Sequence, residues 1–109
     1  MRQRLEERLP KRLMVSFGDA GYELIGITNN ISKGGLFIET HKPVSSRNEI
    51  NVRVASSGNE FVIKGEVRWL KKPLEKESSD INGGMGVRIL EAPIEYYNYV
   101  EYSKYDSMV

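Results

Sequence analysis

The feature that most constrains the fold is a series of short runs in which apolar and polar residues alternate. Alternation with a period of two predicts a β-strand with one buried and one exposed face. Six such runs are separated by stretches rich in Gly, Ser, Asn or Pro, and they cover residues 13–17, 22–32, 36–40, 50–54, 61–69 and 85–89. Short strands at this spacing predict an all-β fold, either an antiparallel barrel or a sandwich.

The run from Phe61 to Trp69 is the longest of these predicted strands. Strict alternation places Trp69 on the same face as Phe61 and Val67, which favours packing of the indole in the core. Gly65 lies in the middle of the run, where a glycine predicts a bend or a bulge of the kind that a small barrel needs at its corners.

The run 22–32 leads into the polar stretch 30–35, whose sequence is NISKGG. An unbroken strand would place Asn30 and Ser32 together on the outer face and point the isoleucines into the core, namely Ile25, Ile27 and Ile31. The glycine pair permits positive φ and close approach of a ligand to the backbone. The stretch therefore suits a small polar ligand, and an ordinary turn between two hairpin strands is the alternative.

Basic residues gather in the first twelve positions, although the whole chain has a formal net charge of only +1. These positions contain five cationic residues and only two acidic ones, Glu6 and Glu7; the cationic residues are Arg2, Arg4, Arg8, Lys11 and Arg12. A basic arm on a nearly neutral body indicates a local anion such as a phosphate-bearing ligand, rather than a broad nucleic-acid-binding surface. A solvated tail is the alternative.

The C-terminal residues favour a short helix. Pro93 suits the first turn of a helix, and Ile94, Tyr97 and Val100 follow at helical spacing. Such a helix would cover the mouth of the barrel. Five tyrosines between Tyr96 and Tyr105 also offer a surface on which a partner protein could dock.

The sequence offers little for catalysis or metal binding. It has no cysteine, and its only histidine, His41, has no acid or second ligand at a recognisable spacing. It also lacks the G-x-S-x-G and H-E-x-x-H motifs of hydrolases, the P-loop motif and the dinucleotide-binding fingerprint. The chain of 109 residues fits one domain, and without a long apolar run we expect a cytoplasmic protein with no direct membrane insertion.

Two motifs in the right order give the chain a family resemblance. Arg4 to Arg8 has the form RxxxR and is followed by Leu9 and Pro10; residues 30–35 have the form [D/N]xSxxG. Together with the segment GMGVR at 84–88, they make the chain resemble a PilZ domain from about Arg4 to Leu90. The resemblance implies a six-stranded antiparallel β-barrel at 13–90, a mobile basic arm at 1–12 and a helix or tail at 91–109.

PilZ domains bind the bacterial second messenger cyclic di-GMP, so the resemblance also implies a ligand and its contacts. By this resemblance, Arg4 and Arg8 would contact guanine and phosphate, and Asn30 and Ser32 would contact guanine. Gly35 would let the backbone pass close to the ligand. The family often has Asp where this chain has Asn30. Further candidates are Arg88 on the same outer surface, Trp69 as a base-stacking residue, and, more weakly, Arg12.

The resulting expectation is a cyclic di-GMP receptor without enzymatic activity or cofactor. Ligand binding would order the arm and relay the signal to a partner protein, in a process such as motility or biofilm formation. One alternative is a PilZ-fold adaptor that acts through protein contacts alone, at the tyrosine-rich tail. Another is a barrel that binds single-stranded nucleic acid, which the near-neutral charge and the lack of an aromatic row disfavour; we therefore expect no DNA or RNA partner.

Overall fold

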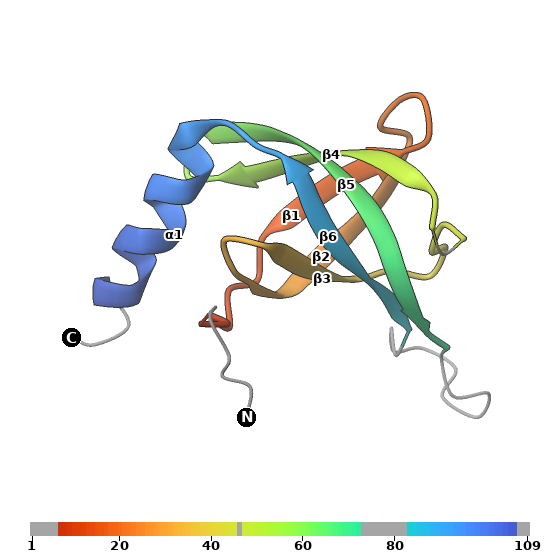
Figure 1. Ribbon diagram of the computed structural model, residues 1–109, viewed down its shortest axis with the longest axis horizontal. Helices are drawn as coiled ribbons and strands as arrows, with labels where there is room; N and C mark the ends of the chain where they lie inside the picture. Colours follow the sequence, from red (N-terminus) through yellow and green to blue (C-terminus); the bar gives the residue numbers. More distant parts are fainter. Residues whose placement is uncertain (1–6, 46, 73–82, 107–109) are drawn as a thin grey trace.

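Six antiparallel strands form a closed barrel, and one helix follows them (Figure 1). The computed structural model describes residues 7–45, 47–72 and 83–106. The elements are β1 (Met14–Gly18), β2 (Leu24–Ile31), β3 (Gly35–Glu39), β4 (Glu49–Ser56), β5 (Asn59–Lys71), β6 (Gly84–Glu91) and α1 (Ile94–Asp106). Around the barrel the strand order is β1-β2-β3-β6-β5-β4. The predicted all-β barrel with a C-terminal helix is confirmed.

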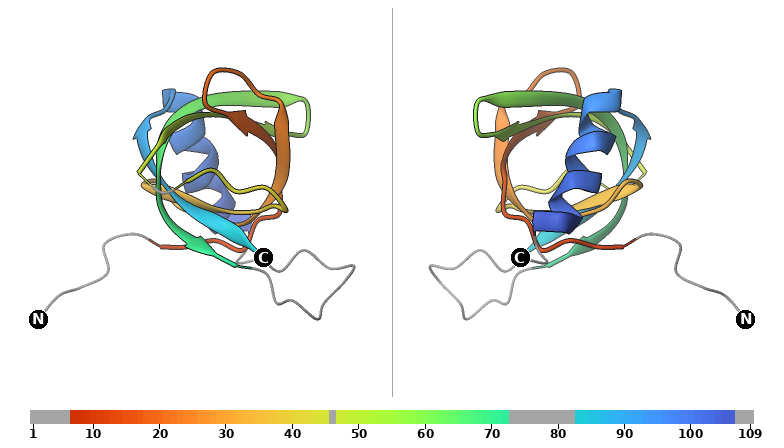
Figure 2. Two further views of the ribbon diagram at one scale, coloured as in Figure 1. Left: turned by 90° about the vertical axis from the view of Figure 1, so that its right-hand side faces the viewer. Right: turned by 90° about the vertical axis from the view of Figure 1, so that its left-hand side faces the viewer.

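The core lies inside this ring, and α1 lies across one of its open ends (Figure 2). Each strand turns alternate apolar side chains inward, as its sequence pattern predicts, and Phe17, Leu36, Val52 and Val67 are fully buried. The helix adds Tyr96 and Val100 to the same cluster.

The buried face of α1 differs from the predicted one. Tyr96, Val100 and Ser103 are buried, whereas Ile94 remains 65% exposed. Their spacing of four and three residues still follows the helical repeat. The prediction was wrong for Ile94, which is the first residue of the helix, whereas Val100 is buried and Tyr97 packs against the core.

A β-bulge in β2 changes the predicted alternation. The register with β3 shifts between Thr28 and Asn30, so one extra residue is inserted. Thr28 and Ile31 both face inward although they are three residues apart, and Ile25 is 69% exposed instead of lying in the core. The prediction for Ile25 was wrong because the bulge lies between Ile25 and Ile31, and the two residues therefore face opposite sides of the sheet.

Two further register shifts occur where β5 pairs with β6. At the first, between Lys64 and Gly65, the extra residue is Leu90 of β6, so the irregularity predicted at Gly65 lies in the partner strand. At the second, between Val67 and Trp69, the extra residue is Arg68 of β5. The second shift turns Trp69 to the outer face, where it is 53% exposed. The interpretation of Trp69 as a core residue was therefore wrong, for the same physical reason as in β2.

The described part of the N-terminal arm is attached to the barrel. Leu9 is 4% exposed and exchanges two backbone hydrogen bonds with Ile31, at 2.8 and 2.9 Å. The arm of residues 1–12, which was expected to be mobile, is thus held at Leu9. Arg4 and the segment 73–82 between β5 and β6 lie outside the described residues.

The described residues include no helix with the length and apolar character that crossing a bilayer requires.

Candidate functional site

Arg8 joins the arm to the polar stretch 30–35. Its guanidinium donates Nε–H and Nη2–H to Oδ1 of Asn30, at 2.9 and 2.6 Å. It also donates Nη1–H to Oγ of Ser32, at 3.0 Å. The backbone hydrogen bonds of the neighbouring Leu9 to Ile31 hold the backbone next to Arg8 against the barrel. Two motifs that are far apart in the sequence therefore form one site.

Ser32 closes a tight turn beneath Arg8. Its hydroxyl accepts the backbone N–H groups of Gly34 and Gly35, at 3.2 and 3.1 Å, as serine commonly does in turns. The residue is 0% exposed, so the prediction that it lies on an open outer face was wrong. The turn and the guanidinium of Arg8 enclose it.

Gly35 permits close approach of two other groups. A β-carbon at this position would lie 2.8 Å from the carbonyl oxygen of Val87 and 3.4 Å from Nη1 of Arg8. Neither Gly34 nor Gly35 has a positive φ, so the expected conformational reason was wrong. The glycine is required by space, because β6 and the arm both pass over it.

Asn30 is the first member of a polar chain along the outer face. Its Nδ2–H donates to Oδ1 of Asn29 at 3.1 Å, and Asn29 donates to Oε2 of Glu39 at 2.8 Å. Arg12 forms an ion pair with the other oxygen of Glu39, at 3.3 Å. Arg12 is thus paired with a carboxylate, whereas Arg8 forms no ion pair with any described residue.

A row of four paired residues, two of them aromatic, crosses the barrel beside Arg8. Asn30 pairs with Phe37, Phe37 with Gly86, and Gly86 with Trp69, so the row runs over four neighbouring strands. The rings of Phe37 and Trp69 are stacked, with centroids 5.1 Å apart and planes 24° apart. A β-carbon on Gly86 would collide with the indole, so this glycine lets the ring lie flat on the sheet.

Two shallow hollows lie on this surface, and both are lined by Arg8 and Trp69. One, of about 180 Å³, is completed chiefly by Gly35, Arg68 and Arg88. The other, of about 370 Å³, is completed by Asn30 and Phe37. All the charged side chains that line the hollows are arginines. Among the described residues only Arg68 of these arginines has an ion pair, to Glu66 at 3.7 Å. Such a surface suits an anionic ligand that also carries flat rings.

The site is connected to α1 by a buried hydrogen bond. The hydroxyl of Tyr96 donates to the backbone carbonyl of Ser32 at 2.7 Å. Tyr96 is itself 0% exposed. A displacement of the turn would therefore change the hydrogen bond between Ser32 and Tyr96 of the helix.

Glu101 connects the same segments on the surface. Its carboxylate lies 2.8 Å from Nζ of Lys33 and 3.4 Å from Nζ of Lys104, and Lys104 also approaches Glu7 of the arm at 3.8 Å. The hydrogen bond from Lys33, with the charge of Lys104, lowers the pKa of Glu101 below its ordinary value. Ion pairs thus connect the arm, the turn and the helix.

Most of the residues predicted for the site are brought together. Arg8, Asn30, Ser32 and Gly35 are in contact, and Arg88 and Trp69 line the same hollow as Arg8. Arg4 lies outside the described residues.

Sequence reasoning missed three residues of the site, namely Phe37, Arg68 and Gly86. Phe37 and Gly86 were read only as members of alternating strands, and Arg68 as a solvated outer residue. A detectable signal was the run RWL at 68–70, which breaks the alternation of β5 and indicates a bulge.

The fold and the site define a small closed-barrel domain with arginine and aromatic side chains gathered on its outer face. The chain belongs to the PilZ domain family, whose model matches residues 2–102. Among curated proteins, none matches the sequence of this chain.

Two solved structures share the fold. The Bacillus subtilis inhibitor of motility, MotI/DgrA, superimposes with a TM-score of 0.77 at 15% identity, over 99% of this chain and 52% of that chain. The chain thus spans about half the length of that relative. The PilZ domain of CeSA from a cellulose-synthesizing bacterium has a TM-score of 0.60 at 14% identity, over 94% of this chain and 99% of that domain.

Proposed function

We propose that this chain is a receptor domain for cyclic di-GMP that relays the presence of the ligand to a partner protein and catalyses no reaction. The observation that carries the proposal is the position of Arg8, which Asn30 and Ser32 hold on the outer face with its charge uncompensated among the described residues. The ligand has two phosphodiester charges and two guanines, and arginine binds both groups.

Arg8 retains hydrogen-bonding capacity in this arrangement. A guanidinium has five N–H donors, and the three bonds to Asn30 and Ser32 use one on each nitrogen. One N–H remains on each terminal nitrogen for a phosphate oxygen or for guanine O6 and N7. In the proposal, Asn30 and Ser32 act first as positioning residues for Arg8 and then, as the family resemblance implies, as contacts to guanine.

The other groups around the hollows complete the proposed contacts. The exposed indole of Trp69 offers a surface for a guanine base, and Phe37 beneath it keeps the ring in place. Arg88 and Arg68 supply positive charge at the side opposite Asn30. The family resemblance implies that Arg4, which belongs to the arm, would also contact the ligand.

The relay half of the proposal is supported by the connections of α1. Tyr96 bonds the turn at Ser32, and Lys104 joins Glu101 to Glu7 of the arm. A ligand that engages Arg8 and the turn would alter contacts that the helix also makes, and a partner would detect the altered surface. The adaptor alternative uses the same helix without ligand, through the exposed Tyr102 and Tyr105.

Isothermal titration calorimetry of the purified chain with cyclic di-GMP, and with GTP as the control nucleotide, tests the proposal. We expect saturable binding of cyclic di-GMP and none of GTP. Arg8→Ala should weaken binding by at least about a hundredfold, because several charge-assisted hydrogen bonds disappear together. Arg12→Ala is the matched control and should bind like wild type, since Glu39 already engages Arg12.

Absence of heat, and absence of a thermal shift at millimolar ligand, would reject the receptor and favour the adaptor. Equal loss in the Arg8→Ala and Arg12→Ala variants would instead show that general positive charge, and not the site built around Arg8, binds the nucleotide.

A further inference from the structure

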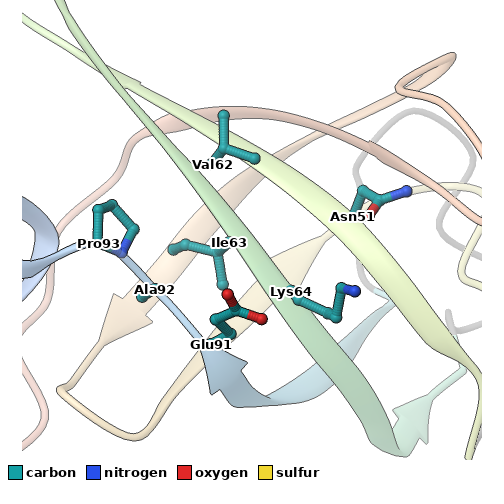
Figure 3. A pocket seen from close by; sticks show the side chains of 7 residues that line it. All are labelled: Asn51, Val62, Ile63, Lys64, Glu91, Ala92 and Pro93. Atoms are coloured by element: carbon teal, nitrogen blue, oxygen red, sulfur yellow. The ribbon is translucent and has the colours of Figure 1, made fainter.

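A second surface feature runs along β5, away from the arginine site. It consists of two open hollows, of about 600 and 350 Å³, that share Val62 and Pro93. The larger lies between β5 and α1, and the smaller continues past Val62 toward β6 (Figure 3). We call the two together the β5 groove. None of its lining residues lines the hollows around Arg8.

The centre of the β5 groove is apolar. Val62 is 54% exposed on the outer face of β5, and Tyr102 of α1 is 69% exposed on the other side. Phe61, which is 5% exposed, and Pro93 contribute to the lining of the larger hollow. Exposed aliphatic and aromatic side chains around a hollow favour the burial of an apolar side chain of another molecule.

The larger hollow is acidic at its edge. Its charged lining residues are Glu60 and Glu95, and no lysine or arginine lines it. Glu95 forms no ion pair within the described part of the chain, and Glu60 has only a long contact with Arg53, at 4.0 Å. The smaller hollow has one residue of each sign, Lys64 and Glu91, which are cross-strand partners. The groove thus has a negative end and a neutral end.

We propose that the β5 groove docks a short extended segment of a partner protein, with an apolar side chain over Val62 and a lysine or arginine beside Glu95. Residues 59–64 of β5 line the groove, a length of about 17 Å, which matches about five residues of extended peptide. The inference rests on the relay half of the proposed function, because it supplies the partner's docking surface; it does not depend on nucleotide binding.

A second copy of the chain fits this surface poorly. In a two-fold symmetric dimer each patch faces its own equivalent. Glu60 and Glu95 of one copy would then approach the same carboxylates of the other, and like charges brought together in an interface oppose association. A cationic peptide removes this repulsion, which is why the charge of the groove selects a partner of opposite sign.

The test is a selection of phage-displayed random peptides on the wild-type chain, followed by fluorescence anisotropy of the selected peptides. We expect enrichment of an aromatic or aliphatic residue close to a lysine or arginine. Val62→Asp should weaken binding by about tenfold or more, and Glu95→Lys by several-fold. Ile25→Asp is the matched control, because Ile25 is an aliphatic residue 69% exposed on β2 outside the groove, and it should leave binding unchanged.

Several results would overturn the inference. These are the absence of any enriched motif, selected peptides that bind Val62→Asp as tightly as wild type, and a concentration-dependent dimer in analytical ultracentrifugation that Val62→Asp abolishes. Circular dichroism of Val62→Asp and Ile25→Asp checks that both variants fold. Titration of Val62→Asp with cyclic di-GMP separates the two proposals, because loss of peptide binding with normal nucleotide binding concerns the groove alone.

Discussion

At the scale of single residues, the candidate site depends on one arginine and the groups that position it. Arg8 is exposed, yet three hydrogen bonds to Asn30 and Ser32 fix its orientation. Because Asn30 is neutral, the guanidinium is oriented without being neutralised. An aspartate at position 30 would instead add an ion pair with Arg8.

Asn30→Ala should therefore weaken cyclic di-GMP binding by about tenfold, because Arg8 loses two of the three bonds that hold it. Titration calorimetry measures the change. Asn29→Ala is the control, since Asn29 contacts Asn30 and Glu39 but not Arg8. Equal affinities for wild type and Asn30→Ala would show that the orientation of Arg8 is unimportant.

Gly86 has a similarly specific role beneath Trp69. Gly86→Ala would make a β-carbon collide with Nε1 of the indole and push the ring away from Phe37. Trp69 is the only tryptophan, so its fluorescence reports the change directly. We expect red-shifted emission, and loss of any quenching that cyclic di-GMP causes in wild type.

In Gly21→Ala a β-carbon would meet only the end of the Glu23 side chain, and this control should keep the wild-type spectrum. An unchanged spectrum in Gly86→Ala would mean that the ring does not lie on the glycine.

At the scale of elements, β-bulges and the C-terminal helix decide which residues reach the site. The bulge in β2 places Asn30 outward directly before the inward Ile31, and the bulge in β5 turns Trp69 out beside Gly86. The helix then fixes the turn between β2 and β3 through Tyr96, which packs in the barrel mouth and bonds the carbonyl of Ser32. The site and the helix are therefore parts of one packed unit.

Tyr96→Phe should lower the free energy of unfolding by about 1–2 kcal/mol, because a buried hydrogen bond to the carbonyl of Ser32 is lost while the ring remains. Urea denaturation gives this value. Tyr102→Phe should change it little, since Tyr102 is 69% exposed. We also expect weaker cyclic di-GMP binding in Tyr96→Phe alone; identical behaviour of the two variants would exclude a connection between the helix and the turn.

At the scale of the whole molecule, a net charge of only +1 conceals an uneven distribution. Arginines gather around Trp69, glutamates border the β5 groove, and a third group of charges joins the arm, the turn and α1 through Glu101. The first surface suits an anion and the second a cationic segment. A nearly neutral chain can therefore bind partners of opposite charge at separate places.

The charges around Glu101 predict a dependence of stability on pH. Lys33 and Lys104 lower the pKa of Glu101 in the folded protein, so its ionised form stabilises the fold at pH values above the unfolded pKa. This stabilisation disappears as the pH falls through the lowered folded pKa. Melting temperatures of wild type and Glu101→Gln should therefore differ at neutral pH and converge as the pH falls through the lowered pKa of Glu101.

Glu49→Gln is the control for this measurement, because Glu49 is exposed and forms no ion pair with the described residues. A constant difference between wild type and Glu101→Gln across the pH range would mean that the carboxylate charge is not responsible.

The sequence alone predicted six antiparallel strands and a final helix, because alternation and helical spacing are local patterns. The pattern left a barrel and a sandwich open, and the resemblance carried by the two motifs favoured the barrel. It also named most of the site: Arg8, Asn30, Ser32, Gly35, Arg88 and Trp69. Only the tertiary structure decided how these residues meet. A bulge inserts one residue where two strands pair, which a single strand's sequence does not specify, and each insertion reverses the faces beyond it.

The same reason explains what was missed or wrong. Ile25 and Trp69 were assigned to the core because strict alternation was continued through the bulges in β2 and β5. Phe37 and Gly86 gained their roles from neighbouring strands that are distant in sequence. The hydrogen bond from Tyr96 to Ser32 likewise joins residues 64 positions apart. Patterns along the chain thus predicted the kind of fold, whereas contacts between distant strands decided the geometry of the candidate site.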